Sequence, residues 1–181
     1  MSTSKVTLLG LTLLIVACGS ETAVEIPPPQ ELSREHIGYY CNMIVADHQG
    51  PKGQIHLSNG KQPVWFTSVR DTITFTLLPG EPKNITVIYV NDMAKASWAT
   101  PEAGTWIDAR DAWYVIGSDR RGGMGAPEPV PFSDRQAATR FSGSHGGSVV
   151  AYAELPPDYF LNVASASPGP GAQPKLDKPH E

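Results

Sequence analysis

Two stretches of this chain carry the same succession of secondary-structure signals, and this repetition limits the folds that the chain can adopt. Phe66 and Phe75 lie nine residues apart, and Phe132 and Phe141 repeat the same spacing further along the chain. A β-branched run follows each pair. Self-similarity at a fixed separation indicates a duplicated structural unit. A chance resemblance between two short segments is the alternative.

Each unit is expected to contain two strands, a helix and a third strand. The expected elements are strands at 39–46 and 54–57, a helix at 69–77 and a strand at 85–90 in the first unit, and strands at 106–107 and 112–116, a helix at 135–141 and a strand at 148–152 in the second. The sequence therefore predicts an α+β fold of two tandem ββαβ units, at about 36–95 and 104–155, with small antiparallel sheets.

Capping residues mark where the two predicted helices begin. Thr67 or Ser68 can cap the first helix, which has to end before Pro79. Ser133 and Gln136 fit a capping box at the start of the second helix.

The first residues have the layout of a secretory signal. Lys5 supplies a positive charge, and an apolar run at residues 6–17 follows it. This run is short for a membrane-spanning helix, has no stop-transfer flank and ends at Cys18 in the pattern that lipoprotein signal peptidase cleaves. We therefore expect residues 1–17 to be a signal peptide and Cys18 to carry the lipid. An ordinary cleaved signal with an incidental cysteine is the alternative.

Segments rich in proline or small residues flank the predicted globular part at 36–160. Residues 18–35 contain a run of three prolines, which favours extended structure and predicts a semi-stiff spacer after the lipid anchor. Residues 161–181 are rich in Ala, Ser, Gly and Pro and are expected to form a disordered tail.

Charge and motifs exclude several classes of function. The formal net charge is −4 at pH 7 and no basic stripe is present, which argues against nucleic acid as a partner. The sequence contains no G-x-S-x-G elbow and no phosphate-binding loop. We expect the protein not to be an enzyme, with Cys41 as a nucleophile activated by His48 as the catalytic alternative.

Cys41 and Met43 place two soft sulfur donors on either side of one residue. If lipid modification consumes Cys18, the Cys41 thiol has no partner within the chain in an oxidising compartment. On a strand, side chains two residues apart share one face. Thiolate and thioether sulfur favour Cu(I), whereas the spacings typical of zinc sites are missing. A cysteine and a methionine that fill the core are the alternative.

Two further residues are candidate metal ligands. His48 follows the predicted strand in a turn-rich loop, where Asp47 could orient its imidazole. Met124 stands among glycines, where no regular core stripe explains a large apolar side chain. A histidine bonded to backbone and a methionine packed on the sheet are the alternatives.

Several runs of the sequence resemble the nitrous oxide reductase accessory lipoproteins, the NosL family. The similar segments are CNMIVADHQGPK at 41–52, IYVNDMA at 88–94, WIDA at 106–109 and GGMGAPE at 122–128. The resemblance extends from Cys18 to about Phe160. Asn42 stands where the family more often has glycine, and Gln49 where it often has proline.

This resemblance implies a lipid-anchored Cu(I) chaperone in the periplasm of denitrifying bacteria, and its anchorage is compatible with the outer membrane. The implied partners are nitrous oxide reductase and a membrane copper transporter or ABC-type assembly complex. The implied ligands are Cys41 and Met43, with His48 and Met124 as candidates. The implied fold of two ββαβ units has a likeness to organomercurial lyase. A docking lipoprotein that binds no metal and, on fold analogy alone, a lyase-like enzyme are the alternatives.

Overall fold

Two small antiparallel sheets form the framework of the computed structural model, which describes residues 25–162. The first sheet has the strand order β2-β1-β3-β4, with β1 at Gly53–Leu57, β2 at Val64–Phe66, β3 at Ile85–Asn91 and β4 at Trp106–Asp108. The second has the order β6-β5-β7, with β5 at Trp113–Ile116, β6 at Val130–Phe132 and β7 at Ser148–Ala151. The predicted α+β class with two small antiparallel sheets is confirmed.

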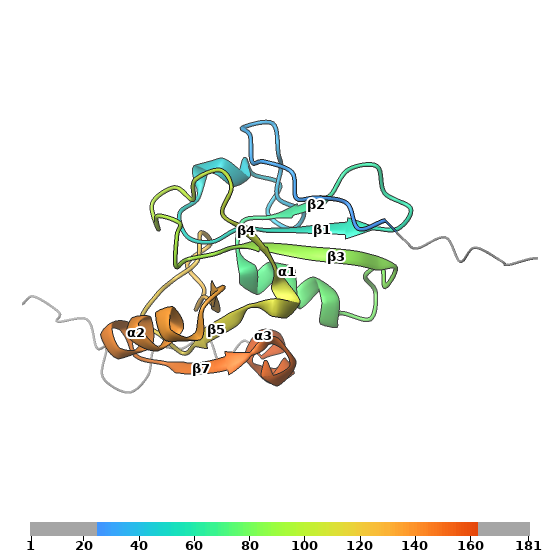
Figure 1. Ribbon diagram of the computed structural model, residues 1–181. Helices are drawn as coiled ribbons and strands as arrows, with labels where there is room; N and C mark the ends of the chain where they lie inside the picture. The colour runs from blue at the N-terminus through green and yellow to red at the C-terminus, as the bar shows by residue number, and fades with distance from the viewer. Residues whose placement is uncertain (1–24, 163–181) are drawn as a thin grey trace, which may run out of the picture.

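Three α-helices accompany the sheets within the described residues: α1 at Val69–Leu77, α2 at Arg135–His145 and α3 at Pro157–Leu161. Helix α1 lies below the first sheet, and α2 and α3 lie near opposite ends of β7 (Figure 1). The order β2-β1-β3 in the first sheet matches the order β6-β5-β7 in the second, and a helix follows β2 and β6 in turn. The repeated phenylalanine spacing therefore corresponds to a repeated ββαβ topology.

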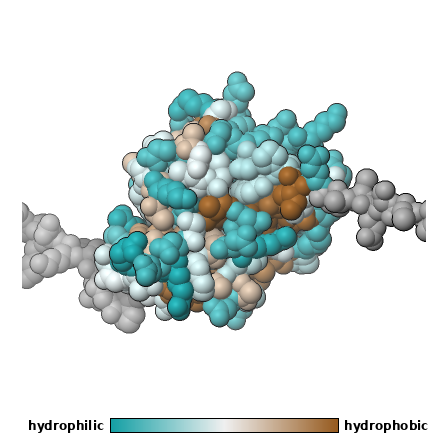
Figure 2. Space-filling model, in the orientation of Figure 1, coloured by the Kyte–Doolittle hydropathy of each residue, from teal (hydrophilic) through white to brown (hydrophobic). Residues whose placement is uncertain are grey.

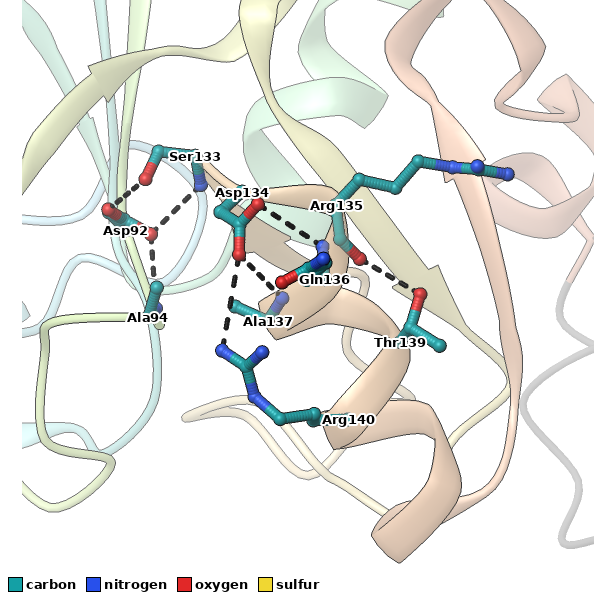
Figure 3. Close-up of polar contacts among 9 residues, drawn as sticks. All are labelled: Asp92, Ala94, Ser133, Asp134, Arg135, Gln136, Ala137, Thr139 and Arg140. Atoms are coloured by element: carbon teal, nitrogen blue, oxygen red, sulfur yellow. Dashed lines mark hydrogen bonds and ion pairs between the residues drawn. The ribbon is translucent and has the colours of Figure 1, made fainter.

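Local capping explains where the two longer helices begin. Ser68 caps α1 by accepting a hydrogen bond from the Asp71 amide, as predicted. The predicted capping box at α2 is wrong, because Asp134 accepts from the amides of Gln136 and Ala137 (Figure 3). Helix α2 also extends to His145, beyond the predicted end.

Ser133, which the sequence suggested as a helix cap, instead connects the two halves of the fold. Its amide and its hydroxyl donate to the carboxylate of Asp92 at 2.9 and 2.6 Å (Figure 3). The Asp92 side chain is fully buried, just after β3. Burial alone would raise the pKa of Asp92, but hydrogen bonds from Ser133, Ala94 and Lys95 lower it. A buried carboxylate with these donors fixes the end of β3 against the end of β6.

The predicted strand at 39–46 is wrong. The Gly38 amide donates to the Met43 carbonyl, and the Asn42 amide donates to the Gly38 carbonyl, so the chain reverses here. Asn42 has φ 54°, and it is the one non-glycine residue with positive φ within 25–162. This left-handed conformation, which Asn tolerates, cannot continue a strand.

The strand at 106–107 was predicted as the start of the second unit, but it belongs to the first sheet. Strand β4 pairs antiparallel with β3, where Val90 lies opposite Ile107. The second unit instead takes β6 as its second strand, since β5 pairs with both β6 and β7.

The main hydrophobic core joins the two units. Ile73 and Phe75 of α1 pack with Ile55 and Ile88 of the first sheet and with Tyr114 of the second. The buried Phe160 of α3 belongs to the same cluster. A smaller cluster lies under α2 and contains Val115, Val130, Phe132, Ala137 and Ala138. The two units therefore share one main core.

Residues that were predicted as part of the spacer are bound to the first sheet. The Tyr89 hydroxyl donates to the Pro27 carbonyl at 2.9 Å, and Gln30 exchanges two hydrogen bonds with the Gln54 side chain. Glu31 accepts from the Gly104 amide.

Figure 2 shows a mostly polar face, with an apolar area where the described chain begins.

The predicted signal peptide, the lipidation residue Cys18 and residues 163–181 lie outside the described part of the chain. Within 25–162, no helix has the length and apolar character needed to cross a membrane.

Candidate metal centre

The turn at residues 38–43, which we call the 38–43 turn, carries Cys41 and Met43. Residues Ile37 and Ile44 pair as an antiparallel bridge at its base. The Tyr39 amide donates to the Trp65 carbonyl at 2.8 Å, which fixes the turn beside β2. The predicted placement of Cys41 and Met43 on one face of a strand is therefore replaced by their placement in one tight turn.

The thiol of Cys41 is half-buried and forms no disulfide with any described residue. Its sulfur lies 3.8 Å from the hydroxyl oxygen of Thr67, a residue that is 1% exposed. A Cβ atom placed on Gly38 would lie 2.6 Å from the same sulfur, which is closer than such contacts allow. Gly38 and Thr67 together therefore fix where the Cys41 sulfur lies.

Met43 and Met124 are both accessible to solvent, with 40% and 46% of their surface exposed. The alternative that Met43 fills the core is therefore wrong. Met124 is exposed on a loop that Arg121 and Pro127 close as a bridge, which we call the 121–127 loop. Its exposure argues against packing of Met124 on the sheet. Exposed thioethers are free to reach a metal ion or a partner protein.

His48 contacts the 121–127 loop. Its Nδ1 lies 3.1 Å from the carbonyl oxygen of Gly123. A carbonyl oxygen only accepts hydrogen bonds, so Nδ1 carries the proton in this contact, and in the neutral imidazole Nε2 is then the nitrogen with the free lone pair. Asp47 pairs with Arg34 instead of His48, at 2.6 Å, so the predicted role of Asp47 in orienting the imidazole is wrong.

The junction between β2 and α1 brings these segments together. Thr67, in this junction, contacts Cys41 of the 38–43 turn. Its neighbour Ser68 lies beside Gly122 of the 121–127 loop, where an added Cβ would be 3.3 Å from the Ser68 Cβ. The next residue of that loop, Gly123, binds His48. The segments that carry the predicted ligands thus border one junction.

The buried carboxylate of Glu128 bonds to the start of α1, directly after this junction. Glu128 is 1% exposed, and its Oε1 accepts a hydrogen bond from the Val69 amide at 2.7 Å. Burial raises the pKa of Glu128 to about 8. Its Oε2 has no hydrogen-bond partner and lies against Gly122, where an added Cβ would be in contact with it. Glu128 therefore fixes the 121–127 loop to the start of α1.

Lys52 is a buried cation whose charge interacts with that of Glu128. Its ammonium donates to the carbonyls of Gln49 and Gly50 at 2.9 and 2.6 Å. Burial lowers the pKa of Lys52 to about 8, and the charge of Glu128 opposes that shift. These two bonds fix the segment that follows His48. Within residues 25–162, no three side chains of His, Cys, Asp or Glu form a group that could hold a metal ion.

The NosL family model matches residues 29–160 of the sequence. The chain belongs to the NosL family. The copper-binding lipoprotein NosL of Achromobacter cycloclastes is 43% identical over 166 residues, which cover 91% of this chain and 83% of that protein. The copper-binding lipoprotein NosL of Stutzerimonas stutzeri is 34% identical over 131 residues, which cover 72% and 67%.

A solved NosL structure shares this fold. The crystal structure of the copper chaperone NosL from Shewanella denitrificans matches with a TM-score of 0.67 and 32% identity, over 71% of this chain and 97% of that one. These NosL proteins are named for copper binding or a chaperone role and not for a reaction, which agrees with the expectation that the chain is not an enzyme.

Sequence reasoning missed two residues around the 38–43 turn. Thr67 was considered only as a helix cap, although its hydroxyl faces Cys41. Glu81 was not considered at all, although its carboxylate accepts hydrogen bonds from Tyr39 and Tyr40. The available signal was the position of the two tyrosines directly before Cys41. Glu81 lies 41 residues after Tyr40, and Thr67 lies 26 residues after Cys41. No local sequence pattern could reveal contacts over such separations.

Proposed function

We propose that this protein is a lipid-anchored Cu(I) chaperone of the periplasm that delivers copper to nitrous oxide reductase. The observation that carries the proposal is the half-buried Cys41 thiol, in one turn with the exposed Met43, in a chain of the NosL family. The names of its relatives support the copper cargo, since two are copper-binding lipoproteins and one is a copper chaperone.

Thiolate and thioether donors match the preference of Cu(I) for soft ligands. Cys41 is the proposed anionic ligand, because a thiolate carries charge and contributes most to affinity. Met43 is the proposed second ligand from the same turn. The exposed position of Met43 leaves the ion accessible to a ligand of the receiving protein.

His48 and Met124 are proposed as further ligands from the other side of the junction. The Gly123 carbonyl bond leaves Nε2 of His48 as the donor atom, the usual arrangement in which a backbone carbonyl orients a metal-binding imidazole. Met124 stands at an exposed position next to Gly123. A small set of donors that solvent can partly reach suits transfer, in which the acceptor ligand binds before Cys41 leaves.

A Cu(I) competition titration tests the binding step. The protein without residues 1–18 is titrated anaerobically against a Cu(I) chelator and, separately, with Zn(II). We expect one Cu(I) per monomer and much weaker zinc binding. Cys41→Ser should abolish tight binding with the fold retained, and Met43→Leu should weaken it. Equal affinity for both ions, or wild-type affinity in Cys41→Ser, would refute the proposed site. X-ray absorption on the copper-loaded protein then counts the sulfur ligands.

Copper content of nitrous oxide reductase tests the delivery step. Cells that lack this chain should make the reductase polypeptide but load it with less copper, so that nitrous oxide accumulates at low external copper. The Cys41→Ser strain should resemble the deletion, and the Met43→Leu strain should be intermediate. Fully loaded reductase in the deletion strain would leave a docking lipoprotein as the function.

Lipid attachment at Cys18 would hold the chaperone near its membrane partners and raise their effective concentration. The expected partners are nitrous oxide reductase and a membrane copper transporter or ABC-type assembly complex. Cys18→Ala should release the protein from the membrane fraction without changing its copper affinity, because a diacyl anchor supplies the two chains that stable attachment needs. A mature protein without lipid would refute this part.

A further inference from the structure

We propose that Glu81 is a positioning residue for the 38–43 turn, and that it sets how tightly and how long the turn holds copper. This inference rests on the proposed function, because it takes Cys41 as the copper ligand. Glu81 lies beyond the end of α1. It does not itself touch the Cys41 sulfur. It acts through the two residues that precede Cys41.

One carboxylate binds two neighbouring phenols. The Tyr39 hydroxyl donates to Oε2 of Glu81 at 3.0 Å, and the Tyr40 hydroxyl donates to Oε1 at 2.9 Å. Hydrogen bonds to a charged acceptor are stronger than those between neutral groups. Because the two tyrosines are adjacent in sequence, both bonds restrain the same stretch of backbone, directly before Cys41.

Glu81 is itself held in place by the end of α1. Its amide donates to the Leu78 carbonyl at 3.2 Å, so it lies in a tight turn after the helix. Lys83 donates to the carbonyls of Thr76 and Leu78 at 2.8 and 2.6 Å. Helix α1 therefore provides a fixed base for the carboxylate.

The tyrosine rings lie on a buried aromatic surface. The Tyr39 ring meets Phe75 edge to face, with ring centroids 5.4 Å apart, and the Tyr40 ring lies 5.8 Å from that of Phe66. Both phenylalanines belong to the main core. The rings are nonetheless exposed, at 47% and 39% for Tyr39 and Tyr40, so ring packing leaves them partly free. The bonds to Glu81 remove that remaining freedom.

Restraint of the turn affects copper binding through pre-organisation. A turn that already holds Cys41 in its binding position loses less conformational entropy when the ion binds. Asn42, next to Cys41, has φ 54°, a left-handed turn conformation that Asn tolerates. Loss of the Glu81 contacts should therefore loosen the turn, weaken Cu(I) binding about tenfold and speed its release.

The experiment compares variants of the soluble protein. Glu81→Ala removes both acceptors, and Tyr39→Phe with Tyr40→Phe removes both donors but keeps the rings. The triple variant combines all three changes. Tyr89→Phe is the matched control, since this residue of β3 loses a hydroxyl bond of 2.9 Å to the Pro27 carbonyl, away from the turn. Cu(I) affinity and dissociation rate are measured by transfer to a chelator.

Amide hydrogen exchange of the copper-free protein supplies an independent readout. The Gly38 and Asn42 amides are bonded within the turn, so their exchange reports its opening. We expect faster exchange at these amides in Glu81→Ala and in the double phenylalanine variant, with unchanged exchange at the core residues Ile55 and Ile88. Both variants should also bind Cu(I) about tenfold more weakly, and Tyr89→Phe should match the wild type.

The triple variant decides whether Glu81 acts through the phenols. If it does, Glu81→Ala has no further effect once both hydroxyls are gone. Additive losses in the triple variant, or wild-type affinity and exchange in Glu81→Ala, would overturn the inference while the copper site itself stands. A wild-type protein that binds no Cu(I) would instead refute the proposed function, on which the inference rests.

Discussion

The sulfur of Cys41 and the hydroxyl oxygen of Thr67 lie 3.8 Å apart, although 26 residues separate them in the sequence. In the metal-free thiol, sulfur can donate its proton to the hydroxyl. A thiolate only accepts, so the Thr67 hydroxyl has to donate when Cys41 loses its proton to bind copper. The same contact can thus serve both states with a reversed donor.

We predict that Thr67→Val weakens Cu(I) binding about fivefold, the equivalent of about 1 kcal/mol for one lost hydrogen bond. Thr67→Ser, which keeps the hydroxyl, should remain near the wild type. Thr72→Val is a matched control, because Thr72 is buried on α1 and its hydroxyl bonds to the Ser68 carbonyl. Chelator competition gives the affinities. An equal loss in Thr72→Val would assign the effect to the fold and not to the sulfur contact.

Gly123→Ala tests the placement of His48. A Cβ on Gly123 would lie 2.6 Å from the Cβ of His48 and 3.2 Å from the Gln49 carbonyl oxygen, so the loop and the imidazole have to separate. We predict that Gly123→Ala and His48→Ala both remove a nitrogen ligand from the X-ray absorption spectrum of the copper-loaded protein. Gly143→Ala, with open space around it on α2, is the control. A nitrogen contribution that survives in His48→Ala would exclude this histidine.

Glu128 should make stability depend on pH. Its pKa is about 8 in the folded protein against 4.5 for a free glutamate, so the folded chain binds more protons between these values. The contribution of Glu128 to stability therefore falls as pH rises through this window, by at most about 1.4 kcal/mol per pH unit. We predict that Glu128→Gln removes the fall, as measured by urea unfolding from pH 5 to about 7.5. The series stops there because Lys52, with a pKa of about 8, also loses its proton at higher pH. An unchanged pH profile in Glu128→Gln would contradict the prediction.

Asp92 should be the most sensitive polar residue at the connection between the two units. Asp92→Ala leaves the Ser133 amide and hydroxyl without their acceptor, and we predict a loss of about 2–4 kcal/mol in the free energy of unfolding. Asp134→Ala removes the exposed cap of α2 and should cost only about 1 kcal/mol. Similar losses from the two changes in urea unfolding would argue against a connecting role for Asp92.

Local signals were sufficient to predict the parts of the fold that depend on nearby residues. Helix α1 has its predicted bounds because Ser68 caps it and Pro79 follows its end. The prediction of a strand at 39–46 rested on the aromatic and β-branched residues of this segment, which favour strands. It was wrong because the backbone hydrogen bonds of the segment close a turn. Asn42, a residue type that tolerates the left-handed conformation of a turn, was the local signal of that turn.

Long-range pairing decided what the sequence could not predict. No local pattern shows that the strand with Trp106 pairs with β3 instead of β5, because the pairing depends on which strand edge is available. The chemical types of Cys41 and Met43 predicted them as copper ligands, and their roles remain predictions. Their surroundings, Thr67 and Glu81, come from segments 26 and about 40 residues further along the chain.

The buried Arg70 connects α1 to the last described helix, α3. From α1, its guanidinium donates to the carbonyl of Tyr159, 89 residues later, and lies over the ring of Tyr159 at 5.0 Å. Phe160 beside it closes the same core that holds Ile73 and Phe75. The core around α1 is therefore covered only when residues near the end of the described chain are in place. A chain that ends before residue 157 would lack α3, and the junction that supports Cys41 would rest on an open core. Copper loading should thus depend on α3, and a chain truncated before residue 157 should take up little of the metal.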